Sequence, residues 1–567
     1  MLGDMSRPFA LVFAGLMAAF FACFFLWPIW TTVQLAFEGP DHRFSLDYVA
    51  EVFLNPLYRE GLVNAFTIAL ATTLGCLLLS LPLALLFVRY DYPGKILLNS
   101  LILMPMVLPP FVGAIGIKAI LGQAGALNAL LIQVGLMDPQ RPVDWLGEWQ
   151  MAGMVGMEIL HLYPILYLNL AAALANLDPA LEEAAANLGC SPWRRLRRVT
   201  LPLILPGIFA GGTLVFIGSF TELGVPLIFD FDRVTAVQIF RSLNDLSDNP
   251  FPYALVVVLL GCSTLIYVIG KGLFGSAEAL GGGRATLECQ PVRLGRWAGI
   301  GCALAFAGVF LMAVLPHLGV VLLSLADDWY ATVLPVRWTL AHYAGALGHD
   351  LTLSSIANSL KYSLAALVLA LGLGTGIAYL NVRTRIWGRQ WLDLLAMLPL
   401  AVPGVVLAFG YLAMTRPGRS FDGLILGEDP LLILVIAYAV RRLPYVVRSA
   451  TAGFQQVHPV LEEVAQNLGA TPWRGLRRIT LPLVLPNLVA GGLLAFAFAM
   501  LEVSDSMILA QQAVHYPITK AIYSLVMSLG DGPALASALG VWAMVFLAVT
   551  LAGASLILGK KLGALFR

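Results

Sequence analysis

Two stretches of the sequence place charged residues in the same order and at the same spacing. The first reads LEEAAANLGCSPWRRLRRVTLPLILP from Leu181, and the second reads LEEVAQNLGATPWRGLRRITLPLVLP from Leu461. In both stretches, glutamates are followed by a glycine and then by a group of arginines. The sequence shows no HExxH or GxSxG motif and no paired carboxylates beside a nucleophile. These residue types therefore indicate contact with a soluble partner rather than catalysis.

Each stretch predicts a short helix, a glycine break and a second, basic helix. Acidic residues suit the start of a helix because its dipole favours negative charge there. Gly189 can end the first helix in the left-handed conformation, and Ser191-Pro192 has the pattern of a cap followed by a first-turn proline. Such a rigid elbow is suited to transmitting a push from the partner. The candidate contact residues are Glu182, Glu183, Ala184, Ala185, Gly189, Pro192 and Arg194, and in the second copy Glu462, Glu463, Val464, Ala465, Gly469, Pro472 and Arg474.

A second candidate group consists of ionisable residues inside apolar segments, which are costly unless they are paired or hydrated. Two of them, Glu222 and Glu502, correspond in the repeat and lie ~27–30 Å along their helices from the preceding prolines. Two interpretations stay open. The charges line a polar path for a small charged solute, or Glu222 and Glu502 only pair with arginines to hold the structure together. The candidates are Glu158, His161, Glu222, Arg441, Arg442, Glu502 and Asp505.

The composition places these residues in a membrane protein. Of 567 residues, 59% are hydrophobic and 12% are charged, whereas a soluble domain carries about 25% charged residues. The net charge of +1 and the lack of a long basic tail give no sign of a nucleic-acid partner. The six cysteines are scattered without metal-site spacing, which is typical of small buried hydrophobic residues. No metal site is predicted.

The apolar segments predict an all-α polytopic membrane protein with about twelve spans. The first is too long and ends in residues too bulky for a cleaved signal peptide, so we expect it to be retained. Arginines and lysines gather in alternate short loops, which predicts that both termini and both charged stretches are cytoplasmic. The predicted spans lie roughly at 8–30, 62–88, 97–120, 152–174, 204–228, 253–274, 295–325, 358–381, 391–414, 431–450, 484–510 and 533–559.

The chain is predicted to be a tandem duplication. Glu183 and Glu463 stand 280 residues apart, and His161 and Arg441 keep that offset, whereas Asn64 and Asn358 are 294 residues apart. The first half therefore contains a longer external loop. We expect two parallel halves packed as a pseudo-dimer around a central pathway. The predicted units are a first half at 1–276 with its charged stretch at 179–206, a cytoplasmic linker at 277–292, and a second half at 293–567 with its charged stretch at 459–486.

Both charged stretches resemble the EAA loop of binding-protein-dependent ABC importer permeases. The matching residues are Glu183-Ala184-Ala185 with Gly189, and Glu463-Val464-Ala465 with Gly469. The second copy has Val464 where the family usually has alanine, which is a small apolar change. The resemblance implies a type I, MetI-like permease fold in a bacterial inner membrane. It also implies that each loop is a coupling helix seated on one of two ATPase subunits, and that a periplasmic solute-binding protein delivers the substrate.

The sequence does not predict an ATPase, because it lacks the phosphate-binding loop GxxxxGK[ST]. We therefore expect a transport subunit that is not an enzyme and binds no cofactor, with ATP and Mg²⁺ held by the separate ATPase. Nucleotide would drive alternating access between the two halves. A secondary transporter driven by an ion gradient is the alternative of another class, although it has no reason to duplicate such an elbow.

Three further segments, 220–240, 249–261 and 441–445, resemble the ferric-iron importer permeases and the related 2-aminoethylphosphonate permeases. Thiamine and polyamine permeases share the architecture. Ferric iron favours clustered oxygen or histidine ligands, whereas arginines beside glutamates suit a solute that carries phosphonate and ammonium groups. The sequence leaves the choice of substrate open.

Overall fold

The computed structural model describes residues 7–39, 43–106, 108–147, 149–245, 249–274, 291–425 and 429–558. Of the predicted linker, 277–292, only residues 291 and 292 lie within these ranges, and residues 1–6 and 559–567 at the two ends lie outside them. The described part is helical apart from two small two-stranded sheets. The sequence-based expectation of an all-helical chain is therefore confirmed for these residues.

The first half contains the following elements in chain order: α1 (Arg7–Phe21), η1 (Ala22–Leu26), α2 (Trp27–Ala36), α3 (Asp47–Leu54), α4 (Pro56–Arg89), β1 (Tyr90–Asp91), α5 (Lys95–Ile102), η2 (Met104–Met106), α6 (Pro110–Leu121), α7 (Ala126–Gln133), α8 (Gln150–Ala175), α9 (Pro179–Asn187), α10 (Pro192–Arg195), η3 (Leu196–Thr200), α11 (Leu201–Phe220), α12 (Gly224–Ile228), α13 (Thr235–Arg241), η4 (Ser242–Asp245) and α14 (Phe251–Phe274).

The second half continues with β2 (Val292–Arg293), α15 (Arg296–Leu325), β3 (Ala326–Asp328), β4 (Arg337–Trp338), α16 (Ala341–Gly348), α17 (Asp350–Arg383), α18 (Arg389–Met397), η6 (Leu398–Leu400), α19 (Gly404–Met414), η7 (Asp422–Leu424), α20 (Leu431–Gln456), α21 (Val460–Asn467), α22 (Pro472–Gly475), η8 (Leu476–Thr480), α23 (Leu481–Met500), α24 (Ser504–Leu509), η9 (Ala513–His515), α25 (Ile518–Val526) and α26 (Gly532–Leu558).

Within the described ranges, 10 helices are long and apolar enough to cross a membrane, or 11 if a bent pair is counted. This is fewer than the twelve spans that the sequence predicts. The bent pair is Arg389–Leu400 with Gly404–Met414, which turn by 103° where one straight span, 391–414, is predicted. The segment predicted at 431–450 forms α20, a helix of 26 residues whose three arginines set it apart from the apolar helices.

The predicted span at 97–120 is also divided into two helices, α5 and α6. The chain enters α5 through Gly94 and enters α18 through Gly388, and both glycines have a positive φ, 74° and 91°. Pro109 and Pro403 then precede α6 and α19. A proline disfavours helical geometry in the residue before it, so a continuous apolar pattern is divided into two helices here. The apolar span of this region instead runs over Pro110–Gln133.

The two halves exchange their first long helix. Helix α15 of the second half packs on α5 and α6 of the first, and α2 of the first half packs on α19 of the second. Two glycines that correspond in the repeat allow these crossings. A Cβ on Gly116 would lie 2.6 Å from the backbone nitrogen of Val320, and one on Gly410 would lie 2.5 Å from the carbonyl oxygen of Pro28. Next to the second crossing, the Tyr411 hydroxyl donates to the Phe24 carbonyl at 2.7 Å.

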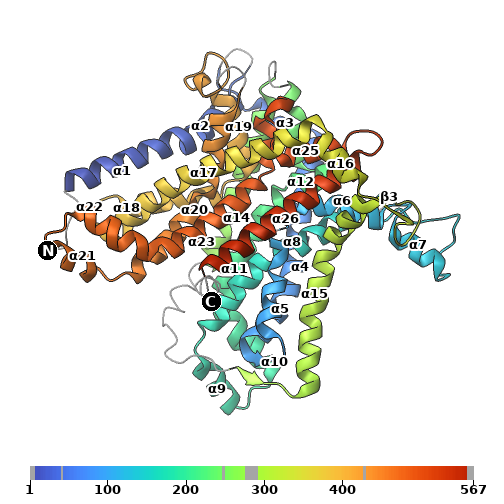
Figure 1. Ribbon diagram of the computed structural model, residues 1–567, viewed down its shortest axis with the longest axis horizontal. Helices are drawn as coiled ribbons and strands as arrows, with labels where there is room; N and C mark the ends of the chain where they lie inside the picture. Colours follow the sequence, from blue (N-terminus) through green and yellow to red (C-terminus); the bar gives the residue numbers. More distant parts are fainter. Residues whose placement is uncertain are drawn as a thin grey trace.

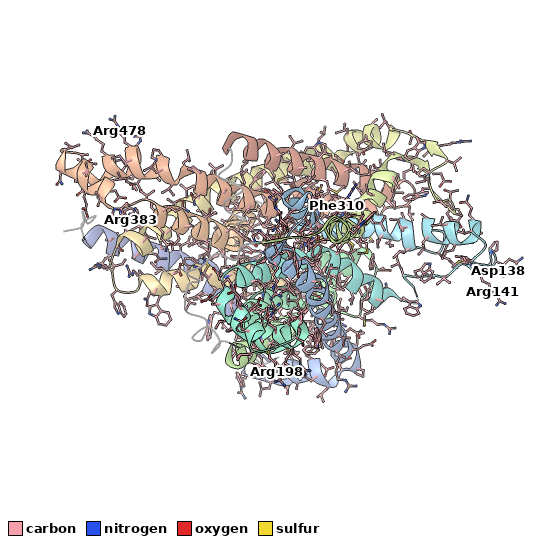
Figure 2. All side chains as sticks on the ribbon, turned by 90° about the horizontal axis from the view of Figure 1, so that it is seen from below. Asp138, Arg141, Arg198, Phe310, Arg383 and Arg478 are labelled. Carbon is pink, nitrogen blue, oxygen red and sulfur yellow. The ribbon has the colours of Figure 1, made fainter. Side chains whose placement is uncertain are left out.

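The halves meet in one central body and then diverge into two arms (Figure 1). The largest cluster of buried side chains draws on both halves, including Val112 of α6 and Val405 of α19. A smaller cluster surrounds Tyr163 in the first arm, and another surrounds Phe454 in the second. Arg198 and Arg478, which belong to the two charged stretches, are at the ends of separate arms (Figure 2). The fold thus connects one central body to two separate elbows.

Candidate functional site

The first charged stretch folds into the predicted elbow. Asp178 caps α9, because its side chain accepts a hydrogen bond from the backbone nitrogen of Ala180 at 3.0 Å. The helix ends at Asn187, and Gly189 two residues later has a φ of 79°. The nitrogen of Cys190 donates back to the carbonyl of Ala185 at 3.0 Å. A positive φ is unfavourable for residues with a Cβ. This conformation explains why a glycine stands at the bend.

The second stretch repeats this geometry. Gly469 has a φ of 86°, and the nitrogen of Ala470 donates to the carbonyl of Ala465 at 2.9 Å. The next helix is capped by a hydroxyl in both copies, since Ser191 accepts from the nitrogen of Arg194 at 3.4 Å and Thr471 accepts from that of Arg474 at 3.3 Å. Pro192 and Pro472 occupy the first helical position, and one π-helical turn, η3 or η8, then leads into α11 or α23.

The outer face of each elbow carries apolar side chains that have no cover. Leu188 is 86% exposed and Leu468 is 84% exposed, and Trp193 and Trp473 are also exposed. Sequence reasoning missed these four residues, although identical apolar residues at matching positions in polar loops were a usable signal. Of the predicted contact residues, Glu183, Ala184, Gly189, Pro192, Arg194, Val464, Gly469, Pro472 and Arg474 are exposed, Ala185 and Glu463 are partly exposed, and Ala465 is buried.

Glu182 and Glu462 point away from this exposed face. Glu182 forms an ion pair with Arg89 at the end of α4 and accepts a hydrogen bond from the Thr200 hydroxyl. Glu462 pairs with Arg383 at the end of α17, with Nε and Oε1 3.1 Å apart, and accepts from the Thr480 hydroxyl at 2.8 Å. The two glutamate side chains are 18% and 16% exposed. These residues therefore join each elbow to its own arm.

The second candidate group lies where α11 and α23 are interrupted. Glu222 stands between α11 and α12, and its Oε1 accepts hydrogen bonds from the nitrogens of Gly224 at 2.9 Å and Val225 at 3.4 Å. A carboxylate in this position caps the helix that follows. A Cβ on Gly224 would lie 3.5 Å from Cγ1 of Val503, which belongs to the matching break in the other half. The two breaks therefore meet in the centre of the molecule.

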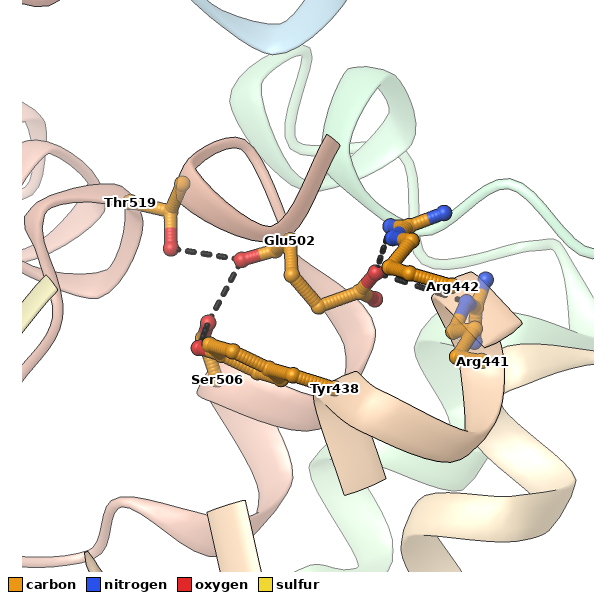
Figure 3. Close-up of polar contacts among 6 residues, drawn as sticks. All are labelled: Tyr438, Arg441, Arg442, Glu502, Ser506 and Thr519. Atoms are coloured by element: carbon orange, nitrogen blue, oxygen red, sulfur yellow. Dashed lines mark hydrogen bonds and ion pairs between the residues drawn. The ribbon is translucent and has the colours of Figure 1, made fainter. Parts of the chain in front are cut away.

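Glu502 occupies the break between α23 and α24 (Figure 3). Its side chain, 3% exposed, pairs with Arg442 and with Arg441, whose Nε is 3.3 Å away. Its backbone carbonyl accepts hydrogen bonds from the hydroxyls of Ser506 at 2.5 Å and Thr519 at 2.8 Å. Both arginines come from α20, so these ion pairs join elements of the same half.

The remaining predicted residues lie around this centre. Asp505 is 1% exposed, and neither of its carboxylate oxygens has a hydrogen-bond partner among the described residues. Glu158 is buried and accepts hydrogen bonds from Ser219 and from Thr72, the latter at 3.2 Å. His161 takes no part in the ion pairs of Glu502 with Arg441 and Arg442. Its Nδ1 lies 3.1 Å from the carbonyl oxygen of Pro105.

Sequence reasoning missed Lys520, a buried lysine whose Nζ donates to the carbonyl of Met507 at 2.8 Å. Lys520 is a single charge on α25, so its sequence gives no sign of a partner. The fold places it beside Met507 of α24. Within the described ranges, no three His, Cys, Asp or Glu side chains converge in a way that could hold a metal ion. The charged group at the helix breaks consists of carboxylates, such as Glu502 and Asp505, and the arginines Arg441 and Arg442.

Comparison with known proteins identifies the family. The segments 77–276 and 366–555 both match the family described as the inner membrane component of binding-protein-dependent transport systems. The chain belongs to this family. It is a multi-pass inner membrane permease with two permease domains, and it is not an ATPase. The resemblance seen in the EAA-like stretches is thereby confirmed.

Three relatives illustrate the family. The chain is 30% identical over 482 residues to y4fN of Sinorhizobium fredii, named as a probable ABC transporter permease, with 82% of each chain covered. It is 28% identical to FbpB 1 of Haemophilus influenzae, named for ferric transport, over 81% of this chain and 70% of that one. It is 29% identical to PhnU of Salmonella paratyphi A, named for 2-aminoethylphosphonate transport, over 48% of this chain and 90% of that one.

Proposed function

We propose that this permease imports a small charged solute from the periplasm to the cytoplasm, driven by two copies of a separate ATPase. The observation that carries the proposal is the pair of elbows, each with an exposed apolar tip, at the ends of two diverging arms (Figure 2). Uncovered leucine and tryptophan side chains surrounded by charged residues are typical of a protein interface. Two matching elbows suit two identical partners.

The proposed mechanism is alternating access. In the structure the arms diverge towards the elbows, whereas the helix breaks meet in the centre (Figure 1). ATP binding would draw the elbows together, and hydrolysis would release them. The solute would be delivered by a periplasmic binding protein on the side opposite the elbows. Both chain termini are proposed to lie on the elbow side, which is the cytoplasmic side by its arginine content.

The buried charges at the helix breaks are proposed to line the solute pathway. Carboxylates and guanidinium groups buried in a membrane protein are retained at a cost in stability, so a role in transport is the default hypothesis. Glu502 with Arg441 and Arg442 could exchange its internal ion pairs for pairs with a charged solute. The alternative, a purely structural role for these pairs, predicts that transport survives their removal when the fold does.

The relatives suggest two substrates, ferric iron and an organophosphorus compound such as 2-aminoethylphosphonate. Two adjacent guanidinium groups suit the second, because guanidinium matches phosphonate in bidentate geometry. Thiamine and polyamines remain the alternative substrates. Membership of a binding-protein-dependent family also favours the ATP-driven class over an ion-gradient-driven transporter.

The proposal is tested by reconstituting the permease in liposomes with the ATPase and binding protein encoded beside it. We expect ATP-dependent uptake of radiolabelled 2-aminoethylphosphonate or of ⁵⁵Fe³⁺, measured in parallel. A docking variant and a control variant are compared by co-purification of the ATPase. Glu183→Arg with Glu463→Arg should abolish co-purification of the ATPase. Leu78→Ala, which changes an exposed side chain of α4 far from the elbows in sequence, should not. Uptake that persists without the ATPase would contradict the proposal.

A further inference from the structure

Each elbow is fastened to its arm by a three-residue cluster, which we name the latch. The first latch consists of Glu182 on α9, Arg89 at the end of α4 and Thr200 at the end of η3. Both Arg89 and Thr200 donate to Glu182, and Arg89 also donates to the Thr200 hydroxyl at 3.1 Å. The three side chains thus form a closed ring of charge-assisted hydrogen bonds, which are stronger than neutral ones.

The second latch consists of Glu462, Arg383 and Thr480. Nε of Arg383 lies 3.1 Å from Glu462, and the Thr480 hydroxyl donates to the same carboxylate at 2.8 Å. Nη2 of Arg383 also donates to the carbonyl of Val457 at 2.7 Å, just beyond the end of α20. In the second latch the arginine thus donates to a backbone carbonyl in place of the threonine hydroxyl, so both donors meet at Glu462 without closing a ring. The same three residue types meet in both halves, although Arg89 and Arg383 are 294 residues apart and Glu182 and Glu462 are 280 apart. The glutamate–arginine pair thus forms in both halves although the loop between its two residues differs in length.

The latch residues have a different environment from the neighbouring docking residues. Thr200 and Thr480 are completely buried, and Arg383 is 8% exposed. One position further along the chain, Glu183 is exposed to solvent. Successive residues of a helix point in different directions, so Glu183 faces solvent while Glu182 faces the arm. In the second copy Glu463 is partly exposed.

The connectivity shows what the latch would transmit. The threonine ends the π-helical turn that continues directly into α11 or α23, and these helices run without interruption to the breaks at Glu222 and Glu502. The arginine ends α4 or α17, each of which packs along two further helices of its arm. Without the latch, the elbow helix would be joined to the arm through the bend at Gly189 or Gly469 and its flanking loops. With it, the elbow is joined to two long helices by side-chain contacts as well.

We propose that Glu182 and Glu462 are positioning residues that make each elbow rigid with its arm, so that movement of the ATPase reaches the helix breaks. Glu183 and Glu463 would make the contact with the ATPase. The latch rests on the proposed function, because it has a role only if a nucleotide-driven partner moves the elbows.

The test uses the complete permease with its ATPase in lipid nanodiscs and needs no knowledge of the solute. Nitroxide labels replace Leu97 and Trp391, two exposed residues that correspond in the repeat, after the six native cysteines have been substituted. The distance between the labels is measured by dipolar spectroscopy, without nucleotide and after trapping with ATP, Mg²⁺ and vanadate. Co-purification of the ATPase is measured on the same samples.

We expect trapping to shorten the label distance in the parent protein. Glu182→Gln with Glu462→Gln should retain the bound ATPase but lose the shift. Thr200→Val with Thr480→Val should behave in the same way, whereas the conservative Thr200→Ser with Thr480→Ser should restore it. Glu60→Gln, which breaks an exposed ion pair with Arg233 near the other end of α4, should leave the shift intact.

Each remaining outcome is decisive. A normal shift in the double glutamine variant would overturn the latch. Loss of the ATPase from that variant, to the extent caused by Glu183→Gln with Glu463→Gln, would show that Glu182 and Glu462 are themselves docking residues. If the parent protein binds no ATPase or shows no shift, the proposed function is wrong and the latch falls with it.

Discussion

The guanidinium group of Arg441 packs on the backbone of Gly404, in the space where any other residue would carry its Cβ. Gly404 begins α19 directly after the bend that follows η6, and Arg441 is one of the two arginines beside Glu502. The Arg441 side chain of the central charged group can therefore pack against the start of α19 only because residue 404 has no Cβ.

Gly404→Ala should displace Arg441 from Glu502 and reduce transport. Forcing a methyl group into this contact costs about 1–3 kcal/mol, and the displaced guanidinium would have to find a new partner in a buried site. We expect solute uptake by proteoliposomes to fall about tenfold. Gly372→Ala is the matched control, since a Cβ there meets nothing within 4 Å. Equal uptake by the two variants would contradict this role of Gly404.

Removal of Glu502 should be more damaging than removal of Glu222. Glu502→Ala leaves two arginines without their buried counter-ion, and breaking a buried pair from one side costs about 3–5 kcal/mol. Glu222→Ala removes a helix cap, which costs about 1 kcal/mol. Thermal unfolding in detergent should show this order, and uptake by the double alanine variant should be abolished while the ATPase stays bound. Normal transport by that variant would exclude a pathway role for both residues.

The bend of each elbow should tolerate asparagine but not alanine. Gly189 and Gly469 have φ values of 79° and 86°, a conformation that costs most residues about 1–2 kcal/mol and asparagine less. We expect Gly189→Ala with Gly469→Ala to reduce co-purification of the ATPase, and the two asparagine substitutions to retain most of it. Gly475→Ala serves as the control because its helical backbone leaves room for a Cβ. A uniform response to alanine and asparagine would argue against strain as the cause.

The exposed tryptophans should contribute to binding and not to folding. Trp193 and Trp473 are largely exposed, so replacing both with alanine should change the free energy of unfolding by no more than about 0.5 kcal/mol. At an interface, buried tryptophans are among the residues whose truncation costs most. ATPase affinity, measured by titration of the purified subunit, should therefore fall about tenfold or more. A lowered melting temperature with unchanged affinity would reverse this assignment.

The elbows could be predicted from sequence because their information is local. Caps, glycine bends and first-turn prolines follow one another within a few residues, and the repeat presents them twice. The partners of Glu182 could not be predicted in this way, because Arg89 stands 93 residues earlier. Only the packing of α4 beside the elbow brings them together.

The predicted span count, about twelve, differs from the 10 or 11 candidate spans for a different reason. Hydrophobicity alone does not show a bend, so 391–414 reads as one span although its helices turn by 103°. The partners of the first helices were also beyond sequence reasoning. Lipid tails and neighbouring helices are equally apolar, so the pattern around Phe24 does not reveal that this segment lies against Tyr411 of the other half.

The exchange of the first helices also constrains the order of folding. During synthesis, α1 and α2 leave the ribosome well before α17 and α19, the helices of the other half on which they finally pack. Domains of most proteins complete their folding as units, the earlier one first. Here the earlier half cannot reach its final arrangement alone, since α15, which lies on its α6, belongs to the part made later. The first half therefore cannot reach its final arrangement until α15, α17 and α19, which end at Leu325, Arg383 and Met414, have been made.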